Sequence, residues 1–278
     1  MVNLVNQQEE QHMDLQLRGK SVLVTGASKG IGLATARAFA GEGCDVHLAA
    51  RSADALALNK AAIEREFGVR AFAHVLDLGD STALKTLAAN CADVDVLINN
   101  AGEIPSGPLE SLDEAVWRSS YDVKLMGYML LARELYPRMK ARGSGVIIND
   151  IGNSGENWDA NYIAGSTANA ALMAFTKALG GVSLDFGVRV IGVNPGPVET
   201  ERMVKINKRR AIDLWNDESR WTELRDKYPA GRPASAQEVA DLMVFLASPR
   251  AGYITGTIVT IDGGIAARGS VIKERSRQ

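Results

Sequence analysis

Short aliphatic and β-branched runs alternate with longer helical stretches along most of this chain of 278 residues. Most of the short runs are almost continuously apolar, which is typical of strands buried on both faces of a parallel sheet. When strands and helices alternate, the helices cross over between parallel strands and cover both faces of the sheet. The pattern therefore predicts an α/β protein with a doubly wound parallel sheet of about seven strands. The predicted strands are 21–25, 46–50, 70–76, 94–98, 146–151, 188–193 and 257–261.

The helical stretches between these strands complete the predicted body. In the longest of them, Pro137 is expected to disturb the last turns. No repeat or linker divides the body, so residues 19–264 are predicted to form a single domain. Residues 1–18 are rich in Gln and Glu and are expected to form an N-terminal arm, while the basic residues 265–278 are expected to form a mobile tail. The predicted helices are 30–41, 53–67, 81–91, 112–142, 161–180 and 236–247.

Composition narrows the class of partner. The net charge is −2 and the pI is about 6.0, which favours neither a nucleic acid nor an anionic membrane as partner. No apolar run approaches the ~20 residues of a membrane span. The polar N-terminus lacks the pattern of a signal peptide. We therefore expect a soluble, cytoplasmic protein.

The cysteines and histidines are dispersed along the sequence. Cys44 and Cys91 lie far apart without a His or Cys cluster beside either of them, which favours free thiols in a reducing compartment. His12, His47 and His74 are scattered as well. None of the three is assigned to catalysis, and no metal site is predicted.

The first predicted strand ends in a glycine cluster, TGASKGIG at residues 25–32, which opens the following helix. Gly26 permits a tight turn, and the later glycines let the backbone approach a pyrophosphate at the helix N-terminus. The unpaired N–H groups and the positive dipole end of that terminus favour an anion. An isolated cluster can also be a plain strand-to-helix turn. Here, further motifs in the right order favour the cofactor-binding interpretation.

Five motifs in order resemble those of the short-chain dehydrogenase/reductase family over about residues 18–264. They are TGASKGIG, the pair at 77–78, NNAG at 99–102, NPGPVET at 194–200, and Gly256 with DGG at 262–264. The resemblance implies a Rossmann fold, a nicotinamide cofactor and a homotetramer or homodimer. It also implies that 77–78 contact the adenine and that 194–200 hold the nicotinamide carboxamide. The residues expected to bind cofactor are Gly26, Ser28, Lys29, Gly30, Ile31, Gly32, Arg51, Ser52, Asp77, Leu78, Asn99, Ala101, Gly102, Pro195, Gly196, Val198 and Thr200.

The residue after the second strand favours the phosphorylated cofactor. An acidic side chain there would bind the adenosine ribose and repel a 2′-phosphate, but the chain has Ala50, followed by Arg51 and Ser52. Arg51, through its guanidinium fork, and Lys29, as a point charge, would together hold a 2′-phosphate. Both could instead be solvated surface cations. We expect NADP(H) in preference to NAD(H).

In the resembled family a Tyr, a Lys, a Ser and an Asn act together in catalysis, and this chain replaces all four. The segment NAALMAFTKAL at 169–179 is similar to the helix that begins at the family's Lys. It places Asn169 at the Lys position and Gly165 at the Tyr position. Gly152 then stands at the Ser position, and Lys124 stands at the Asn position. The intact spacing argues against a slip in the alignment.

Four residues are the candidates for a rearranged catalytic site. Tyr162 lies three positions before Gly165, on the same helical face, where its phenol would reach into the space left by the glycine and act as acid/base. Lys124 is expected to lower the pKa of that phenol. Asn169 is expected to bind the ribose or a water, and Ser154 to donate to a substrate carbonyl. Tyr162 could equally be an aromatic wall of the pocket, and Ser154 a loop hydroxyl or helix cap.

Segment 201–230 falls where the family builds its substrate lid. Its aromatic residues Trp215, Trp221 and Tyr228 fit either an apolar ligand or the packing of a lid helix. Substrate, pathway and reaction direction do not follow from the fold. The sequence favours an NADP(H)-dependent oxidoreductase that interconverts a small-molecule carbonyl and an alcohol through a non-standard acid/base site. The alternative is a catalytically inactive NADP(H)-binding protein that acts as a sensor or partner subunit.

Overall fold

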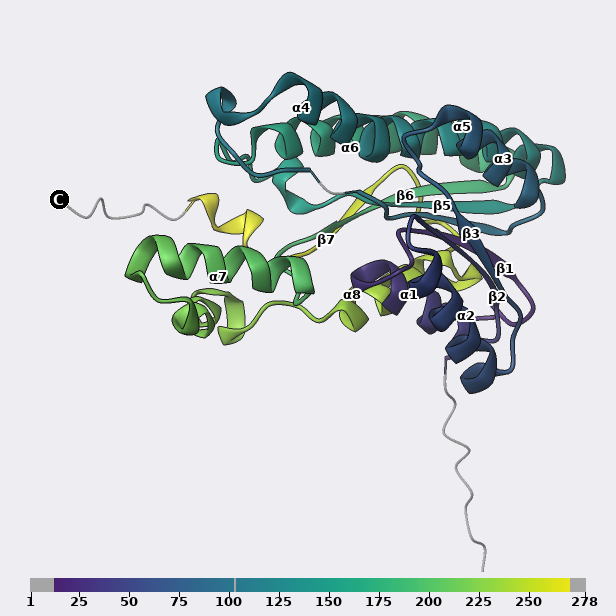
Figure 1. The fold of residues 1–278 in the computed structure, drawn as a ribbon. Helices are drawn as coiled ribbons and strands as arrows, with labels where there is room; N and C mark the ends of the chain where they lie inside the picture. The colour runs from purple at the N-terminus through teal and green to yellow at the C-terminus, as the bar shows by residue number, and fades with distance from the viewer. Residues whose placement is uncertain (1–12, 103, 271–278) are drawn as a thin grey trace, which may run out of the picture.

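The structure, a computed structural model, describes residues 13–102 and 104–270. Seven parallel strands form one sheet in the order β3-β2-β1-β4-β5-β6-β7 (Figure 1). The predicted doubly wound sheet is confirmed, and each strand end lies within two residues of its predicted position. Strand order reverses beside β1, and sheets of this kind bind ligands outside the carboxyl ends of their strands at this point. The strands are β1 (Ser21–Thr25), β2 (Asp45–Ala50), β3 (Ala71–Val75), β4 (Val96–Asn99), β5 (Gly145–Asp150), β6 (Val188–Pro195) and β7 (Ile258–Ile261).

Helices cover both faces of this sheet (Figure 1). The helices α3, α4, α5 and α6 lie on one face, and α1, α2 and α8 lie on the other. Two buried apolar layers result: Phe39, Leu56 and Met243 belong to the layer under α1, α2 and α8, while Leu87 and Leu131 belong to the layer under α3 and α5. The helices are α1 (Gly30–Gly41), α2 (Ala53–Phe67), α3 (Ser81–Asn90), α4 (Glu114–Tyr121), α5 (Gly127–Arg142), α6 (Ile163–Ser183), α7 (Glu201–Trp215) and α8 (Ala236–Ala247).

The single helix predicted over 112–142 is wrong, because the structure divides this stretch. After α4, a π-helical segment covers Asp122–Met126 before α5 begins. Pro137 lies inside α5 without ending it. A π-helical turn inserts an extra residue into a helix, and such insertions are frequent at functional sites. Lys124 lies in the middle of this segment, so the departure from a regular helix occurs at a predicted catalytic residue.

Each predicted terminal segment is described only in part. Residues 1–12 of the arm and 271–278 of the tail lie outside the described residues. In the remainder of the arm, Leu17 is only 3% exposed and belongs to the core. Its carbonyl accepts a hydrogen bond of 3.2 Å from Sγ of Cys44. Among the helices of the described ranges, none is long and apolar enough to cross a membrane.

Candidate active site

The glycine loop between β1 and α1 lies tightly against the end of β4. A Cβ atom added at Gly26 or Gly32 would meet Nδ2 of Asn100 at 2.7 or 2.4 Å, so a side chain at either position would displace that amide. Asn100 donates from Nδ2 to the carbonyl of Thr25 at 2.8 Å. Lys29, the N-cap of α1, makes no side-chain hydrogen bond to the first turn. The N–H groups of that turn are therefore available to an anion, as dinucleotide binding requires.

Two asparagines that the sequence analysis did not assign support this loop. Besides Asn100, Asn59 on α2 donates from Nδ2 to the carbonyls of Ala27 and Ser28, at 3.3 and 3.0 Å. Asn59 was missed because a polar residue on a helix gives no sign in the sequence that it bonds to a loop between two other elements. The position of Ser28 in the loop is set by these bonds.

The residues expected at the adenosine end differ in the hydrogen bonds and ion pairs that they already form. Arg51 is exposed just beyond β2 and forms no hydrogen bond or ion pair within the described ranges. Ser52 caps α2 by accepting a bond of 3.4 Å from the N–H of Ala55. Lys29 pairs with Glu201 at the start of α7 over 3.2 Å, with both side chains largely exposed. Exposed pairs of this kind contribute only ~0–1 kcal/mol, so an incoming phosphate can compete for Lys29.

Among the residues expected to bind the cofactor, Asp77 lies at the surface, while Leu78 and Asn99 are buried. Asp77 is exposed and accepts a bond from the N–H of Gly79 at 2.9 Å, while Leu78 is buried. The Asn99 side chain is buried and donates to Oδ1 of Asn149 at 2.9 Å, which ties β4 to β5. Any contact of Asn99 with a cofactor would therefore come from its backbone.

The remaining residues expected to bind the cofactor follow the carboxyl ends of β1, β4 and β6. Gly102 packs so closely on Lys124 that a Cβ atom there would lie 2.8 Å from Cδ of the lysine. Thr200 caps α7 by accepting from the N–H of Met203 at 3.3 Å. Its methyl group would lie 3.6 Å from a Cβ atom at Gly30, so the lid begins against the glycine loop. The rest of this set lies at the start of α1, after β4, and at or after the end of β6: Ile31, Ala101, Pro195, Gly196 and Val198.

The Tyr162 ring fills the space beside Gly165. A Cβ atom added at Gly165 would lie 1.9 Å from Cε1 and 2.1 Å from Cζ of Tyr162. The ring therefore occupies the volume into which any side chain at position 165 would project. Tyr162 is half-buried and packs in a small apolar cluster with Ile104 and Ala168. The sequence hypothesis that its phenol reaches into the space left by the glycine agrees with this geometry.

Lys124 extends from the π-helical segment to the end of β5. Its Nζ donates to the backbone carbonyl of Asp150 at 3.3 Å and lies 5.5 Å from the ring centroid of Tyr128. The Tyr128 hydroxyl donates to the same carbonyl at 3.1 Å. Burial is the largest cause that raises the pKa of Tyr128, followed by the charges of Asp150 and Tyr162. Lys124, Tyr128 and Asp150 thus form one cluster. Tyr162 acts on this cluster through its charge, and no hydrogen bond joins Tyr162 to Lys124 within the described residues.

The pKa values of Lys124 and Asp150 in this cluster are shifted in the direction that favours the neutral form of each group. Burial lowers the pKa of Lys124 to about 8, against the opposing effect of Asp150 and with a further lowering by Arg202. Burial raises the pKa of Asp150 to about 6, against the effect of Lys124. Strongly shifted groups of opposite sign at the carboxyl end of a strand are typical of active sites. Asp150 was not predicted, because its position within an apolar strand gave no signal of a buried carboxyl group.

Asn169 and Ser154 are bonded to each other. Nδ2 of Asn169 donates to Oγ of Ser154 at 2.8 Å and to the carbonyl of Gly152 at 3.3 Å. Oδ1 of Asn169 is buried without a hydrogen-bond partner. A buried acceptor left unpaired costs ~1–3 kcal/mol, and a ribose hydroxyl or a water would satisfy it. The site therefore fits a nucleotide at this position. Gly152 has φ of +113°, so a serine there would be strained.

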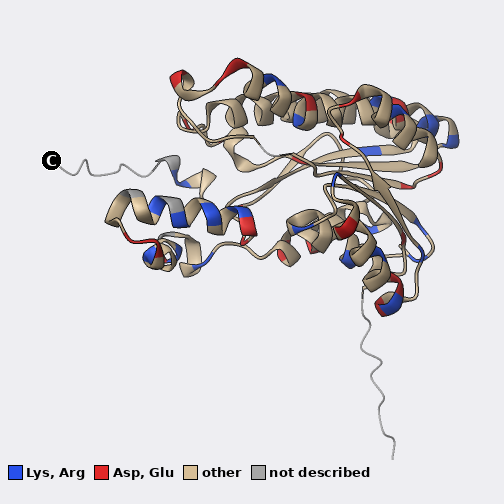
Figure 2. Ribbon diagram, viewed as in Figure 1, with Lys and Arg blue, Asp and Glu red and all other residues tan. Residues whose placement is uncertain are grey.

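Segment 201–230, the predicted lid, is basic along α7 (Figure 2). Arg202 in its first turn donates to the carbonyl of Ile104 at 2.7 Å, and its charge acts on Lys124. The Tyr228 hydroxyl donates to Asn207 within the lid at 3.3 Å, and the Arg220 guanidinium lies 4.3 Å from the Trp215 ring centroid. These contacts agree with the packing interpretation of the lid aromatics.

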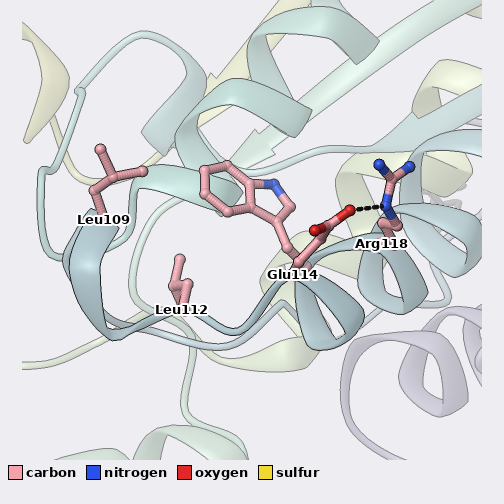
Figure 3. Close-up of a pocket in the computed structure, with 5 residues that line it drawn as sticks. Leu109, Leu112, Glu114 and Arg118 are labelled. Atoms are coloured by element: carbon pink, nitrogen blue, oxygen red, sulfur yellow. Dashed lines mark hydrogen bonds and ion pairs between the residues drawn. The ribbon is translucent and has the colours of Figure 1, made fainter.

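A surface hollow of about 430 Å³ lies beside α4 (Figure 3). Leu109 and Leu112 line it, and the ion pair of Glu114 with Arg118, 2.8 Å from Oε1 to Nε, stands at its edge. None of the four predicted catalytic residues lines this hollow. It is assigned no part in the chemistry.

The fold and crevice define a dinucleotide-binding α/β protein whose polar residues gather at the carboxyl ends of the central strands. A family model described as Enoyl-(Acyl carrier protein) reductase matches residues 26–266. The chain is 35% identical to galactitol 2-dehydrogenase (L-tagatose-forming) of Cereibacter sphaeroides, over 90% of this chain and 96% of that protein. It is 32% identical to the 3-oxoacyl-acyl-carrier-protein reductase of Vibrio harveyi, over 90% and 99%.

A solved structure gives the same result. L-sorbose reductase of Gluconobacter frateurii, complexed with NADPH and L-sorbose, superposes with a TM-score of 0.86 at 32% identity and covers 91% of this chain and 99% of that one. The chain therefore belongs to the short-chain dehydrogenase/reductase family of oxidoreductases.

Proposed function

We propose that this protein is an NADP(H)-dependent oxidoreductase that interconverts a carbonyl and an alcohol, with Tyr162 as the proton donor and acceptor. The observation that carries the proposal is the Tyr162 ring in the volume beside Gly165. Bound nicotinamide supplies or accepts the hydride, and the residues of this chain handle the substrate oxygen and its proton. In reduction, the Tyr162 hydroxyl gives its proton to the oxygen that becomes the alcohol; in oxidation, the same group takes it back.

Neighbouring residues adjust this proton transfer. The Lys124 ammonium lies against Tyr128, on which the charge of Tyr162 also acts, and it stabilises the phenolate that forms at Tyr162 when its proton is transferred. Ser154 is held by Asn169, so its hydroxyl hydrogen is free to point at a substrate oxygen. Asn169 offers its unpaired Oδ1 to a ribose hydroxyl or a water. Asp150 balances the charge of Lys124.

The pH dependence of turnover tests the role of Lys124 and Asp150. With pKa values of about 8 and about 6, both groups are charged between these limits. We expect kcat/KM to be highest in that window, to fall below about pH 6 as Asp150 is protonated, and to fall above about pH 8 as Lys124 loses its charge. Bell-shaped profiles of this kind report the groups of the free enzyme. Asp150→Asn should remove the acid limb and move the alkaline limb to lower pH, because the Asp150 charge raises the pKa of Lys124. A flat wild-type profile from pH 5.5 to 9 would contradict the assignment.

Arg51→Asp tests the preference for NADP(H). An arginine–phosphate hydrogen bond contributes ~1.5–3 kcal/mol, so we expect NADPH to bind roughly 10–100-fold more weakly, with little change for NADH. Direct binding measured by cofactor fluorescence gives both constants. Arg65→Asp is the matched control, because Arg65 is an exposed arginine in the last turn of α2. An equal loss for NADPH and NADH would contradict the preference.

The second candidate function is an NADP(H)-binding protein without turnover. It is favoured by the bond of Lys124 Nζ to a backbone carbonyl rather than to Tyr162. NADPH fluorescence separates the two functions. Enhancement that decays when a ketone, aldehyde or quinone is added indicates an enzyme, while enhancement that persists with every carbonyl class indicates a sensor or partner subunit.

Substrate, assembly and location extend the proposal. The positive charges of Arg202 and α7 favour a polar or anionic small molecule over an apolar one (Figure 2).

We further propose a homotetramer or homodimer in the cytoplasm, as the family resemblance implies. Exposed apolar side chains at Val116 and Met126, which are 47% and 40% exposed, support a contact between copies on that side.

A further inference from the structure

Three side chains of types that commonly bind metals meet beside β2 and β3. None of them is a candidate active-site residue. Nδ1 of His47 lies 3.0 Å from Nε2 of His74. Sγ of Cys91 lies 3.4 Å from the first of these nitrogens and 3.7 Å from the second. No metal was predicted, because 27 residues separate His47 from His74 and 17 more separate His74 from Cys91. Parallel pairing of the strands brings them together.

We propose that His47, His74 and Cys91 bind one transition-metal ion of the zinc class through two imidazole nitrogens and one thiolate. For tetrahedral Zn²⁺ with Zn–N of 2.0–2.1 Å and Zn–S of 2.3 Å, two ligand nitrogens lie about 3.3 Å apart and a nitrogen and a sulfur about 3.6 Å apart. The three observed separations lie within about 0.3 Å of these values. The mixed nitrogen and sulfur ligand set also suits zinc-class ions rather than Mg²⁺ or Ca²⁺.

Hydrogen bonds alone satisfy this cluster poorly. A neutral imidazole nitrogen has either one hydrogen or one lone pair, yet His47 Nδ1 lies within bonding distance of both His74 Nε2 and Cys91 Sγ. It cannot form two full hydrogen bonds at once. A metal ion between the three atoms accepts a lone pair from each, and the thiol proton leaves to solvent.

Rigid elements position the three ligands before any ion arrives. His47 lies within β2 and pairs with Phe72, while His74 on β3 pairs with Ala49, so both imidazoles project from the same face. The His47 ring stacks on Phe72 at 4.5 Å and on His74 at 5.2 Å between centroids. Cys91 caps α3, and its N–H bonds to the carbonyl of Leu87. The three side chains therefore need little further ordering to bind an ion.

Three protein ligands leave one position of a tetrahedral ion to be filled. The carboxylate of Asp45, which lies on the same strand as His47, accepts bonds of 2.9 and 2.5 Å from Arg70. Asp45 is therefore not the fourth ligand. His47 and His74 are half-buried, and the fourth position is open to water or to an added ligand.

A bound ion would join the edge strand β3 to β2 and α3. The chain leaves β2 toward Arg51 and leaves β3 toward Asp77, both predicted cofactor residues. Metal binding is therefore expected to stabilise the fold at the side of the crevice that receives the adenosine. Zn²⁺ a hundredfold above its dissociation constant should raise the Tm by about 5–10 °C.

Spectroscopy of the full chain tests the proposal. Protein stripped with a chelator is titrated with Co²⁺ and then with Zn²⁺. One equivalent of Co²⁺ should produce a thiolate-to-metal charge-transfer band and intense visible bands of tetrahedral coordination, and Zn²⁺ should abolish them. Cys91→Ser should remove the charge-transfer band and weaken binding by more than about a hundredfold.

Two further variants keep the test decisive. His74→Phe keeps a β-compatible aromatic residue on the edge strand and should also abolish stoichiometric binding, even if Cys91→Ser folds poorly. Cys44→Ser is the matched control, because Cys44 is the other buried thiol and bonds to Leu17 instead. It should bind as the wild type does. Absence of a charge-transfer band in the wild type, or the same band in His74→Phe, would overturn the proposal. Neither result depends on the proposed catalytic activity.

Discussion

Tyr162→Phe is expected to lower kcat by roughly 10²–10⁴-fold, the typical loss when a positioned general acid is removed. The phenylalanine ring keeps the volume beside Gly165 filled and loses only the hydroxyl. The fold and the glycine loop should therefore be unchanged, and NADPH should bind as tightly as before. Steady-state turnover and NADPH binding, measured on the same preparation, separate a lost proton donor from a lost cofactor site.

Tyr253→Phe is the matched control for this variant, because Tyr253 is 93% exposed and lies outside the crevice. It should retain full turnover. If Tyr162→Phe kept more than half of the wild-type kcat, then Tyr162 would be a wall of the pocket and the catalytic assignment would be wrong.

Gly165→Ala is expected to lower turnover nearly as much, although it adds only a methyl group. That methyl would lie 1.9 Å from Cε1 of Tyr162, so the ring must leave its place. The ring belongs to a side chain that can rotate away, and alanine favours a helix over glycine by ~1 kcal/mol. The Tm should therefore change little while kcat falls by roughly 10²–10⁴-fold.

The same helix supplies the control. A Cβ atom at Gly181 meets nothing within 4 Å, so Gly181→Ala should leave turnover unchanged and raise stability by up to ~1 kcal/mol. A double-mutant cycle makes the test specific. Once Tyr162→Ala has removed the ring, adding Gly165→Ala should have no further effect on kcat, because the two changes act on one group. Additive losses would show that Gly165 matters for another reason.

The strands of the sheet and the proximity of Tyr162 to Gly165 could be predicted from the sequence. Near-continuous apolar strands identified the sheet. The three-residue spacing predicted Tyr162 and Gly165 on one helical face. In the structure Tyr162 is the non-helical N-cap of α6, and its ring still lies against the glycine. These inferences depend on local geometry, which the sequence encodes directly.

The contacts of Lys124 did not follow in the same way. Lys124 lies in a π-helical segment and bonds to the carbonyl of Asp150. The sequence predicted a regular helix over 112–142, and this contact does not follow from a regular helix. Asp150 itself is a carboxyl group in an apolar strand, and its burial depends on the helices that cover it. The cluster of His47, His74 and Cys91 likewise arises from strand pairing between distant segments.

The most direct test of the account follows NADPH fluorescence in wild-type protein and in Tyr162→Phe while a panel of ketones, aldehydes and quinones is added. The panel includes neutral and carboxylate-bearing members. We predict that both proteins enhance the fluorescence on binding NADPH, that one carbonyl class makes the signal decay in the wild type, and that the decay is at least a hundredfold slower in Tyr162→Phe. Equal decay in both proteins, or no decay in either across the panel, would contradict a relocated acid/base at Tyr162.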